Sequence, residues 1–148
     1  MALEDEIDQL QSNPVFALFD AEALRLIAFS SETRFLRKDD ILFREDELSD
    51  GGYFILSGSL ALSGSAGAEI HGPGALVGET ALFTETQRPA TAVALETTTV
   101  RRIPRQLMRR VLAEFPASAA RLRTILHDKV ASVSAQLMRI HAALPDDA

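Results

Sequence analysis

The chain has 148 residues, of which 47% are hydrophobic and 24% charged, and its 15 basic and 21 acidic side chains give a formal net charge of −6. This composition is typical of a globular domain with a sizeable core and excludes wholesale disorder, while the absence of cysteine excludes disulfides, cysteine-ligated metal centres and a thiol nucleophile. The acidic balance argues against direct binding of nucleic acid by this chain.

The first thirty residues are predicted to form two helices separated by a break. Apolar residues recur at helical spacing until Asn13-Pro14 interrupts the pattern, and Asp20 is a suitable N-cap for the second helix. The N-terminus is acidic where a secretory signal is basic, and no apolar run approaches the roughly 20 residues of a membrane span. We therefore expect a cytoplasmic protein that does not associate with membranes.

Residues 33–103 are predicted to be all-β, because short apolar or alternating runs are separated by turn residues at intervals of about a dozen residues or fewer. Strands of this kind hide their edges by closing into a barrel or packing as a sandwich. The predicted strands are Arg34–Leu36, Ile41–Arg44, Tyr53–Ser57, Ser59–Ser63, Glu69–His71, Ala90–Glu96 and Thr99–Ile103.

Helical periodicity returns after Pro104, and Phe115-Pro116 divides it into two helices. The first is predicted at Gln106–Glu114, and the second extends from Ala117 to about Ala143 without glycine or proline. Apolar residues of the second helix follow the 4, 3, 4, 3, 4 spacing of a coiled-coil seam. They are Leu126, Val130, Val133, Leu137, Ile140 and Leu144.

The segment with recognisable chemistry runs from residue 72 to residue 91, where a short helical turn interrupts the β pattern. Gly78 directly precedes this turn, and the free N–H groups at the start of a helix suit an anion. Arg88 follows on the returning strand and supplies a planar two-pronged donor for the same anion. Glu79 would repel a phosphate unless its carboxylate accepts from a hydroxyl such as a ribose 2′-OH; alternatively it caps the turn.

Gly78-Glu79-x-Ala81-Leu82, followed by Arg88-x-Ala90-Thr91, resembles the phosphate-binding cassette of the cyclic nucleotide-binding domain of the catabolite-activator and fumarate-nitrate-regulator superfamily. The resemblance covers most of the chain. Its other elements are Asn13-Pro14-Val15-Phe16, Tyr53-Phe54-Ile55-Leu56-Ser57-Gly58, Gly72-Pro73-Gly74 and the Phe115-Pro116 helix break.

The resemblance implies a mainly β fold with flanking helices, in which a jelly-roll barrel (a double-stranded β-helix) holds a cyclic nucleotide. A single domain, residues 1–148, would comprise N-terminal helices at 1–30, the barrel at 33–103 with the cassette at 78–91, and C-terminal helices at 105–143. Such a module is no enzyme; it senses cyclic AMP or a relative and signals to a protein partner through its C-terminal helices. The family precedent and the heptad pattern together predict a homodimer through residues 126–144.

The resemblance also implies a site without metal or further cofactor. Glu79 would bind the ribose 2′-OH, Arg88 the cyclic phosphate, and backbone amides near Thr80 and Ala81 its remaining oxygens. Leu82 would be the apolar hinge against the C-terminal helices, and Ser134 would meet the adenine. The ligand-binding set is Gly78, Glu79, Thr80, Ala81, Leu82, Arg88, Pro89, Ala90 and Ser134.

Pro89 departs from the family pattern, because relatives often use the backbone N–H of this residue for the phosphate and proline has none. The loss of one such hydrogen bond weakens binding about 10- to 100-fold, partly offset by the preordered loop. The absence of a Thr at this position mildly favours cyclic AMP over cyclic GMP. A degenerate interaction module that binds no nucleotide is therefore a second hypothesis.

A third hypothesis, a cupin-like metal oxygenase, lacks its histidine cluster, since His71, His127 and His141 have no ligand spacing. Asp40 and Asp46 replace glycines that are common in relatives, and aspartate tolerates the left-handed backbone needed there. The chain ends at Ala148, where transcription-regulating relatives continue into a helix-turn-helix domain, so we expect either a stand-alone sensor or a piece of a longer protein. A further charge run is predicted to form a solvated face that pairs with the acidic N-terminal helix. It consists of Arg101, Arg102, Arg105, Arg109 and Arg110.

Overall fold

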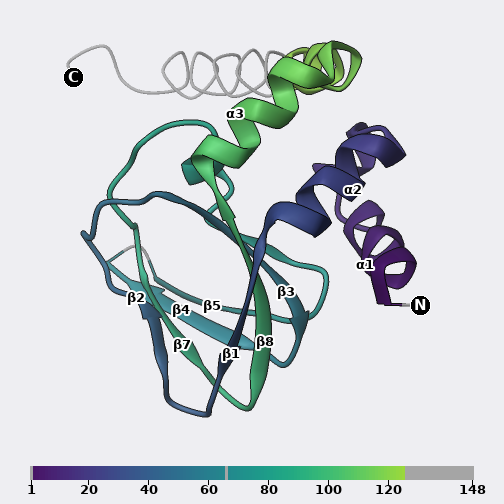
Figure 1. Ribbon diagram of the computed structural model, residues 1–148. Helices are drawn as coiled ribbons and strands as arrows, with labels where there is room; N and C mark the ends of the chain where they lie inside the picture. Colours follow the sequence, from purple (N-terminus) through teal and green to yellow (C-terminus); the bar gives the residue numbers. More distant parts are fainter. Residues whose placement is uncertain (1, 66, 126–148) are drawn as a thin grey trace, which may run out of the picture.

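The computed structural model describes residues 2–65 and 67–125, and its strands form two four-stranded antiparallel sheets with the helices gathered at one end (Figure 1). The strand order is β1-β8-β3-β6 in one sheet and β2-β7-β4-β5 in the other. The facing sheets and flanking helices confirm the predicted jelly-roll fold. The strands are β1 (Glu32–Leu36), β2 (Ile41–Phe43), β3 (Gly51–Ser57), β4 (Leu60–Gly64), β5 (Gly67–His71), β6 (Leu76–Val77), β7 (Thr91–Ala94) and β8 (Thr98–Pro104).

The helical layer begins with α1 (Ala2–Gln11), the 3-10 turn η1 (Phe16–Leu18) and α2 (Ala21–Ser30). The predicted break at Asn13-Pro14 is confirmed, and the buried Asn13 side chain fixes it. Its Oδ1 accepts from the Val15 N–H at 2.9 Å, and its Nδ2 donates to the Gly74 carbonyl at 3.1 Å. The helix break is thereby tied to the turn that precedes β6.

Asp20 occupies the N-cap position of α2, as predicted, but its side chain makes no capping hydrogen bond. Its Oδ1 instead accepts from Nη2 of Arg121 at 2.6 Å. Arg121 lies in the helical stretch 116–125, which follows α3 (Arg105–Glu114) after the predicted break at Phe115-Pro116. Among the helices of residues 2–65 and 67–125, none offers an apolar stretch of membrane-spanning length.

Strand β3 belongs to two apolar cores at once. Tyr53 and Ile55 face the second sheet, where they pack with residues such as Leu60, whereas Phe54 faces the helices and packs with Phe16. The fully buried Phe54 side chain contributes roughly 1.5–3 kcal/mol of hydrophobic stabilisation. Cover on both faces explains why this strand is a continuous apolar run instead of an alternating one.

The sequence interpretation missed β6 and placed the start of β3 two residues too late. Gly51 and Gly52 precede the predicted strand Tyr53–Ser57, yet both lie in β3 opposite Pro104 and Ile103 of β8. A Cβ on Gly51 would be 2.1 Å from the Ile103 carbonyl oxygen, so glycine is needed for the close approach of these two strands. β6 has only two residues, which is too short to show an alternating pattern.

The two left-handed aspartates are Asp39 (φ 73°) and Asp46 (φ 72°), so the expectation is correct for Asp46 and wrong by one residue for Asp40. Asp40 instead stabilises the turn between β1 and β2 by two hydrogen bonds to the backbone of Arg37. Its Oδ2 accepts from the Arg37 N–H at 2.8 Å, and its own N–H donates to the Arg37 carbonyl at 3.0 Å. The left-handed conformation therefore falls on the preceding residue.

Candidate functional site

The predicted cassette leaves β6 at Gly78, forms the 3-10 turn η2 (Thr80–Leu82) and returns to the barrel at β7. Gly78 has φ +77°, which agrees with the expectation that glycine frees the backbone before the turn. A Cβ at this position would be 2.6 Å from Nη1 of Arg88. The two ends of the cassette therefore meet where a glycine leaves room for a guanidinium.

Arg88 points inward, and only 4% of its surface is exposed. Its Nη2 donates to the Gly51 carbonyl at 2.8 Å, and its guanidinium carbon lies 4.3 Å from the centre of the Phe43 ring and 5.7 Å from that of Tyr53. Its Nη1 is buried beside Gly78 without a hydrogen-bond partner. A buried cationic donor without an acceptor is costly, and an anionic oxygen is the group that satisfies it best.

Nearby groups offset only part of the cost of burying the positive charge of Arg88. Burial lowers the pKa of Arg88, and the charge of Arg105 lowers it further, whereas Tyr53 and Asp50 act in the opposite direction. Asp50 Oδ1 lies 3.9 Å from Nη2 of Arg88. Burial favours neutral Asp50, but its hydrogen bond to Arg102 and the charges of Arg102 and Arg88 hold the pKa of Asp50 below its usual value. Asp50 is thus shared between two arginines.

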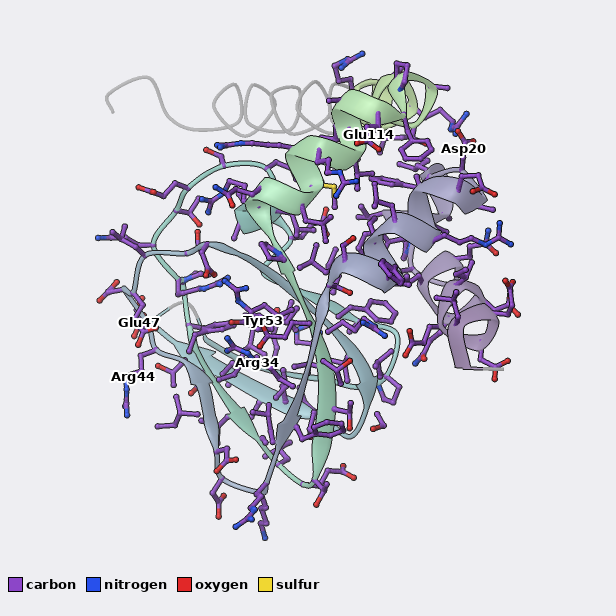
Figure 2. The ribbon with its side chains drawn as sticks, viewed as in Figure 1. Asp20, Arg34, Arg44, Glu47, Tyr53 and Glu114 are labelled. Carbon is purple, nitrogen blue, oxygen red and sulfur yellow. The ribbon has the colours of Figure 1, made fainter. Side chains whose placement is uncertain are left out.

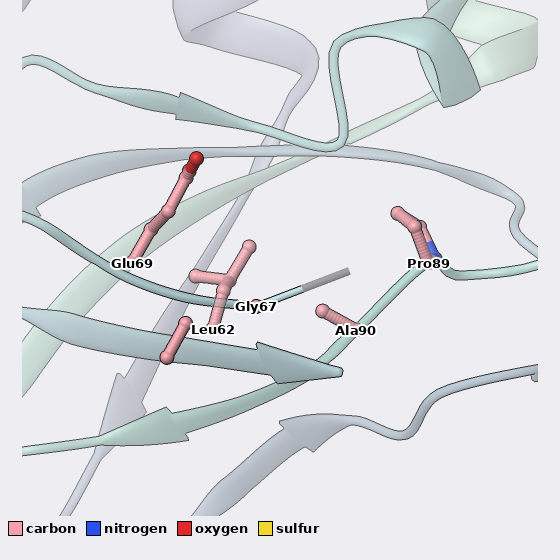
Figure 3. A pocket seen from close by; sticks show the side chains of 6 residues that line it. Leu62, Gly67, Glu69, Pro89 and Ala90 are labelled. Carbon is pink, nitrogen blue, oxygen red and sulfur yellow. The ribbon is translucent and has the colours of Figure 1, made fainter. Parts of the chain in front are cut away.

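A cavity of about 270 Å³ lies between the β4–β5 hairpin and the segment after Arg88 that leads into β7 (Figure 3), and Arg88 itself is not among its lining residues. Two residues of the predicted set, Pro89 and Ala90, form part of its wall. The other lining residues are Leu62, Gly67, Ala68 and Glu69. The lining is largely apolar and includes one carboxylate, Glu69, and it begins one residue after the buried Arg88.

The remaining cassette residues lie around η2. Glu79 is half-buried and occupies the N-cap position of η2, but its side chain makes no capping hydrogen bond, so the alternative capping role is not seen. Thr80 is exposed, and the Ala81 N–H donates to the Gly78 carbonyl at 3.1 Å within the turn. In this arrangement the Ala81 amide stabilises the turn itself.

Leu82 is fully buried in the core that faces the helices, in the same cluster as Met108 and Val111 of α3. Leu82 therefore packs in the same layer as α3, and its role as an apolar hinge stays a prediction. Ser134 and the predicted dimer seam at 126–144 lie outside the described residues, as do His127 and His141. His71 pairs with Glu69 at 3.0 Å, and no group of three or more potential metal ligands occurs among residues 2–65 and 67–125.

The prediction of one solvated arginine face is wrong for Arg105, which is 9% exposed and donates to backbone carbonyls of the cassette and of the β2–β3 loop. Arg101 does pair with Glu6 of α1, as expected, whereas Arg102 pairs with Asp50. No side-chain pattern marks Arg105 as different from its neighbours, because most of its acceptors are backbone carbonyls. The surrounding arginines made it look like part of a charged run.

The contact of Arg88 with aromatic rings was not predicted from the sequence. Figure 2 shows Tyr53 inside the barrel near Arg34, whose guanidinium carbon is 6.0 Å from the Tyr53 ring centre. Phe43 stacks on Tyr53 with ring centres 5.9 Å apart. The alternation of apolar residues marks Phe43 and Tyr53 as core residues but does not show that a cation lies against them.

The family model of the cyclic nucleotide-binding domain matches residues 33–115, which is more than half of the chain. The chain belongs to this family. The match covers the barrel, the cassette and α3. The family assignment made from the cassette motif is therefore confirmed.

Solved structures of two cyclic nucleotide-binding domain relatives extend the comparison. A cyclic nucleotide-binding-like protein from Brucella abortus is 40% identical, with a TM-score of 0.66, over 74% of this chain and 98% of that one. The N-terminal domain of a transcriptional regulator from Streptomyces coelicolor is 25% identical, with a TM-score of 0.78, over 87% of this chain and 94% of that one. The resemblance thus includes helices beyond the residues that the family model matches.

A curated relative is much longer than this cyclic nucleotide-binding domain. Neuropathy target esterase sws of Drosophila grimshawi is 32% identical over 98 residues, which are 62% of this chain but 7% of that protein. The chain therefore spans a small part of the esterase. The families that match are regulatory domains, and the similarity to the esterase is limited to the length of such a domain.

Proposed function

We propose that the protein is a cyclic-nucleotide sensor that binds cyclic AMP and transmits binding to a protein partner through its C-terminal helices. The observation that carries this proposal is the Nη1 of Arg88, a buried cationic donor without a partner that lies beside Gly78. The two residues that follow Arg88, Pro89 and Ala90, line a cavity. A cyclic phosphate supplies the missing acceptor, and the cavity takes the rest of the nucleotide.

In this proposal the cassette side chains keep the roles that the family resemblance implies, whereas the Ala81 amide, expected to bind a phosphate oxygen, is bonded to the Gly78 carbonyl within the turn. Arg88 binds the cyclic phosphate and Glu79 the ribose 2′-OH, while Gly78, Thr80 and Ala81 form the turn that brings backbone close to the ligand. Pro89 and Ala90 line the pocket, and Ser134 contacts the base. The site needs no metal and no cofactor other than the nucleotide, and the module carries out no reaction.

Calorimetric titration with cyclic AMP tests the proposal. Wild-type protein is expected to release or absorb heat with a saturable isotherm, and Arg88→Gln is expected to lower the affinity at least tenfold because the phosphate loses its cation. Arg88→Lys keeps the charge but not the fork and is expected to fall between the two. Arg44→Gln, at an exposed position, is the matched control with unchanged affinity.

Absence of heat at millimolar cyclic AMP in the folded wild-type protein would refute the sensing proposal. Unchanged affinity in folded Arg88→Gln would refute the assigned phosphate site. Parallel titrations with cyclic GMP test the preference for cyclic AMP. We expect weaker binding of cyclic GMP, because the position held by Pro89 has no side-chain hydroxyl to offer the guanine.

A second candidate function is that of a scaffold that keeps the fold but binds no nucleotide. It is favoured by one observation, namely that Arg88 already has internal contacts with the Gly51 carbonyl and with the rings of Phe43 and Tyr53. Under this alternative Arg88 is a core residue, and the missing backbone N–H of Pro89 has no effect on function. A cyclic AMP-dependent rise in melting temperature would exclude the scaffold.

We further propose that the working form is a homodimer through residues 126–144, that it acts in the cytoplasm, and that it neither enters a membrane nor binds nucleic acid itself. The heptad spacing of the apolar residues supports the dimer. The net charge of −6 supports the last point, because phosphate backbones repel an acidic surface.

A further inference from the structure

Arg105, the first residue of α3, contacts two other parts of the chain, the β2–β3 loop and the turn η2. Its N–H donates to the Asp50 carbonyl at 2.7 Å, and its side-chain Nε donates to the Ala81 carbonyl at 3.0 Å. Its Nη2 donates to both the carbonyl and the hydroxyl of Ser49, at 2.8 and 2.9 Å. One buried guanidinium therefore joins the start of α3, the turn η2 and the β2–β3 loop.

The Ser49 contact extends to the far end of the cassette. The Ser49 N–H donates to the Thr86 carbonyl at 2.8 Å, and the Thr86 N–H donates to the Ser49 hydroxyl at 3.0 Å. Two residues later the Arg88 N–H donates to the Glu47 carbonyl at 2.8 Å. The β2–β3 loop thus holds the segment that ends at the phosphate-binding arginine, and Arg105 holds the loop.

We propose that Arg105 is the positioning residue that makes both ends of the cassette and the start of α3 respond as one unit. The proposal rests on the proposed function in so far as the cassette is the ligand-binding element. Here the near end is the η2 side of the cassette, which Arg105 holds at the Ala81 carbonyl directly before Leu82. The far end is the segment before Arg88, which Arg105 holds at Thr86 by way of Ser49. Displacement of either end strains a hydrogen bond to the same side chain, and that side chain is fixed to α3.

The apolar contact of Leu82 with α3 does not perform this task alone. Packing between Leu82 and Met108 is non-directional, so small sliding movements cost little. Hydrogen bonds from a planar guanidinium to Ala81 and Ser49 are directional and fix the distance between the two acceptors. A single ammonium at position 105 does not reach both acceptors with good geometry, so lysine does not replace arginine here.

Hydrogen exchange in the full chain without nucleotide is the primary test. In Arg105→Gln we expect the amides of Leu82, Phe83 and Thr86 to exchange at least tenfold faster, while the amide of Phe115, bonded to Val111 within α3, changes less than twofold. Arg105→Lys is the second, milder variant and is expected to resemble Arg105→Gln within threefold. Arg109→Gln, exposed on the same helix, is the control and leaves both segments unchanged.

Three outcomes would overturn the proposal. The first is cassette exchange within twofold of wild type in Arg105→Gln. The second is equal acceleration in the cassette and in α3, which would make Arg105 an ordinary stabilising residue. The third is full protection in Arg105→Lys, which would show that charge alone suffices.

A second experiment measures the response of α3 to ligand. Because the chain contains no cysteine, Ala113→Cys on the exposed side of α3 provides a single attachment site for a fluorophore. On addition of cyclic AMP the otherwise wild-type chain is expected to change its emission, and the Arg105→Gln chain is expected to lose at least three quarters of that change while still binding. A full response in Arg105→Gln overturns the coupling role. Lack of cyclic AMP binding in the wild type refutes the proposed function and leaves the exchange result to decide the role of Arg105.

Discussion

Arg88 uses its two terminal nitrogens differently: Nη2 donates to Gly51, and Nη1 lies buried beside Gly78 without an acceptor. The next residue, Pro89, is exposed and lines the cavity, but as a proline it has no backbone N–H to donate. At the scale of single residues, the candidate site therefore has a strong donor in the Arg88 guanidinium and lacks a backbone donor at the next residue.

Replacement of Pro89 by Ala restores the missing N–H without adding a hydroxyl. Because a hydrogen bond to a charged group is worth about 1.5–3 kcal/mol, partly cancelled by the freer loop, we expect cyclic AMP to bind about tenfold more tightly in calorimetric titration. Pro73→Ala, in an exposed turn before β6, is the matched control. Equal affinities for Pro89→Ala and wild type would show that the amide at this position does not contact the ligand.

Asp50 gives the protein an acid-sensitive contact through its pairs with Arg102 and Arg88. Because the pKa of Asp50 is lowered in the folded protein, its contribution to stability is present above the unfolded value near 3.9 and is lost as the pH falls through the folded value. The Asp50 carboxylate is 61% exposed, so solvent screening keeps the effect below about 1 kcal/mol.

We therefore expect wild-type protein to lose more stability than Asp50→Asn between pH 5 and pH 3, measured by urea unfolding. Asp39→Asn, in the turn between β1 and β2, serves as the control and is expected to follow the wild type. If Asp50→Asn loses as much stability as the wild type over this range, the Asp50 pair has no such role.

At the scale of elements, η2 connects the candidate site to the helices through one buried side chain. Leu82→Ala removes apolar contacts with Phe54 and with α3, and we expect the free energy of unfolding to fall by about 2–5 kcal/mol in urea titration. Leu48→Ala is the matched control, because Leu48 is 69% exposed and its truncation costs less than about 0.5 kcal/mol. Similar losses for the two variants would contradict the placement of Leu82.

The sequence predicts elements well where one face is buried and poorly where close backbone approach decides the structure. The alternating runs of β4 and β7 were found within a few residues, because their inward positions pack between the sheets. Gly51 lies outside the predicted strand, because its place in β3 depends on how closely β8 approaches. Single-chain patterns record side-chain character, and they do not record distances between strands.

The same reason explains which parts of the candidate site were predictable. Gly78 and Arg88 are predictable because a phosphate site needs a free backbone and a forked cation; the structure gives Gly78 a φ of +77° and buries Arg88, and their binding of phosphate stays a prediction. Arg105 was missed, because its partners are carbonyls of residues 24 and 56 positions away. Backbone acceptors leave no mark in the side-chain sequence.

At the scale of the whole molecule, the heptad positions at 126–144 predict self-association. Leu137→Asp places a charge on the apolar seam, and we expect light scattering to change from twice the chain mass of 16.1 kDa to that mass. Ala135→Asp places the same charge two positions away, off the seam, and is expected to leave the dimer intact. A monomeric wild-type protein at micromolar concentration would refute the dimer.

The position of β3 between two cores determines how the protein melts. Phe54 and its neighbours Tyr53 and Ile55 alternate between the helical layer and the space between the sheets, so neither layer loses its packing without disturbing the other. A single heat-absorption peak follows, with a calorimetric enthalpy equal to the van't Hoff enthalpy. Circular dichroism at helical wavelengths and fluorescence of the sole tyrosine, Tyr53, should then report one common midpoint temperature.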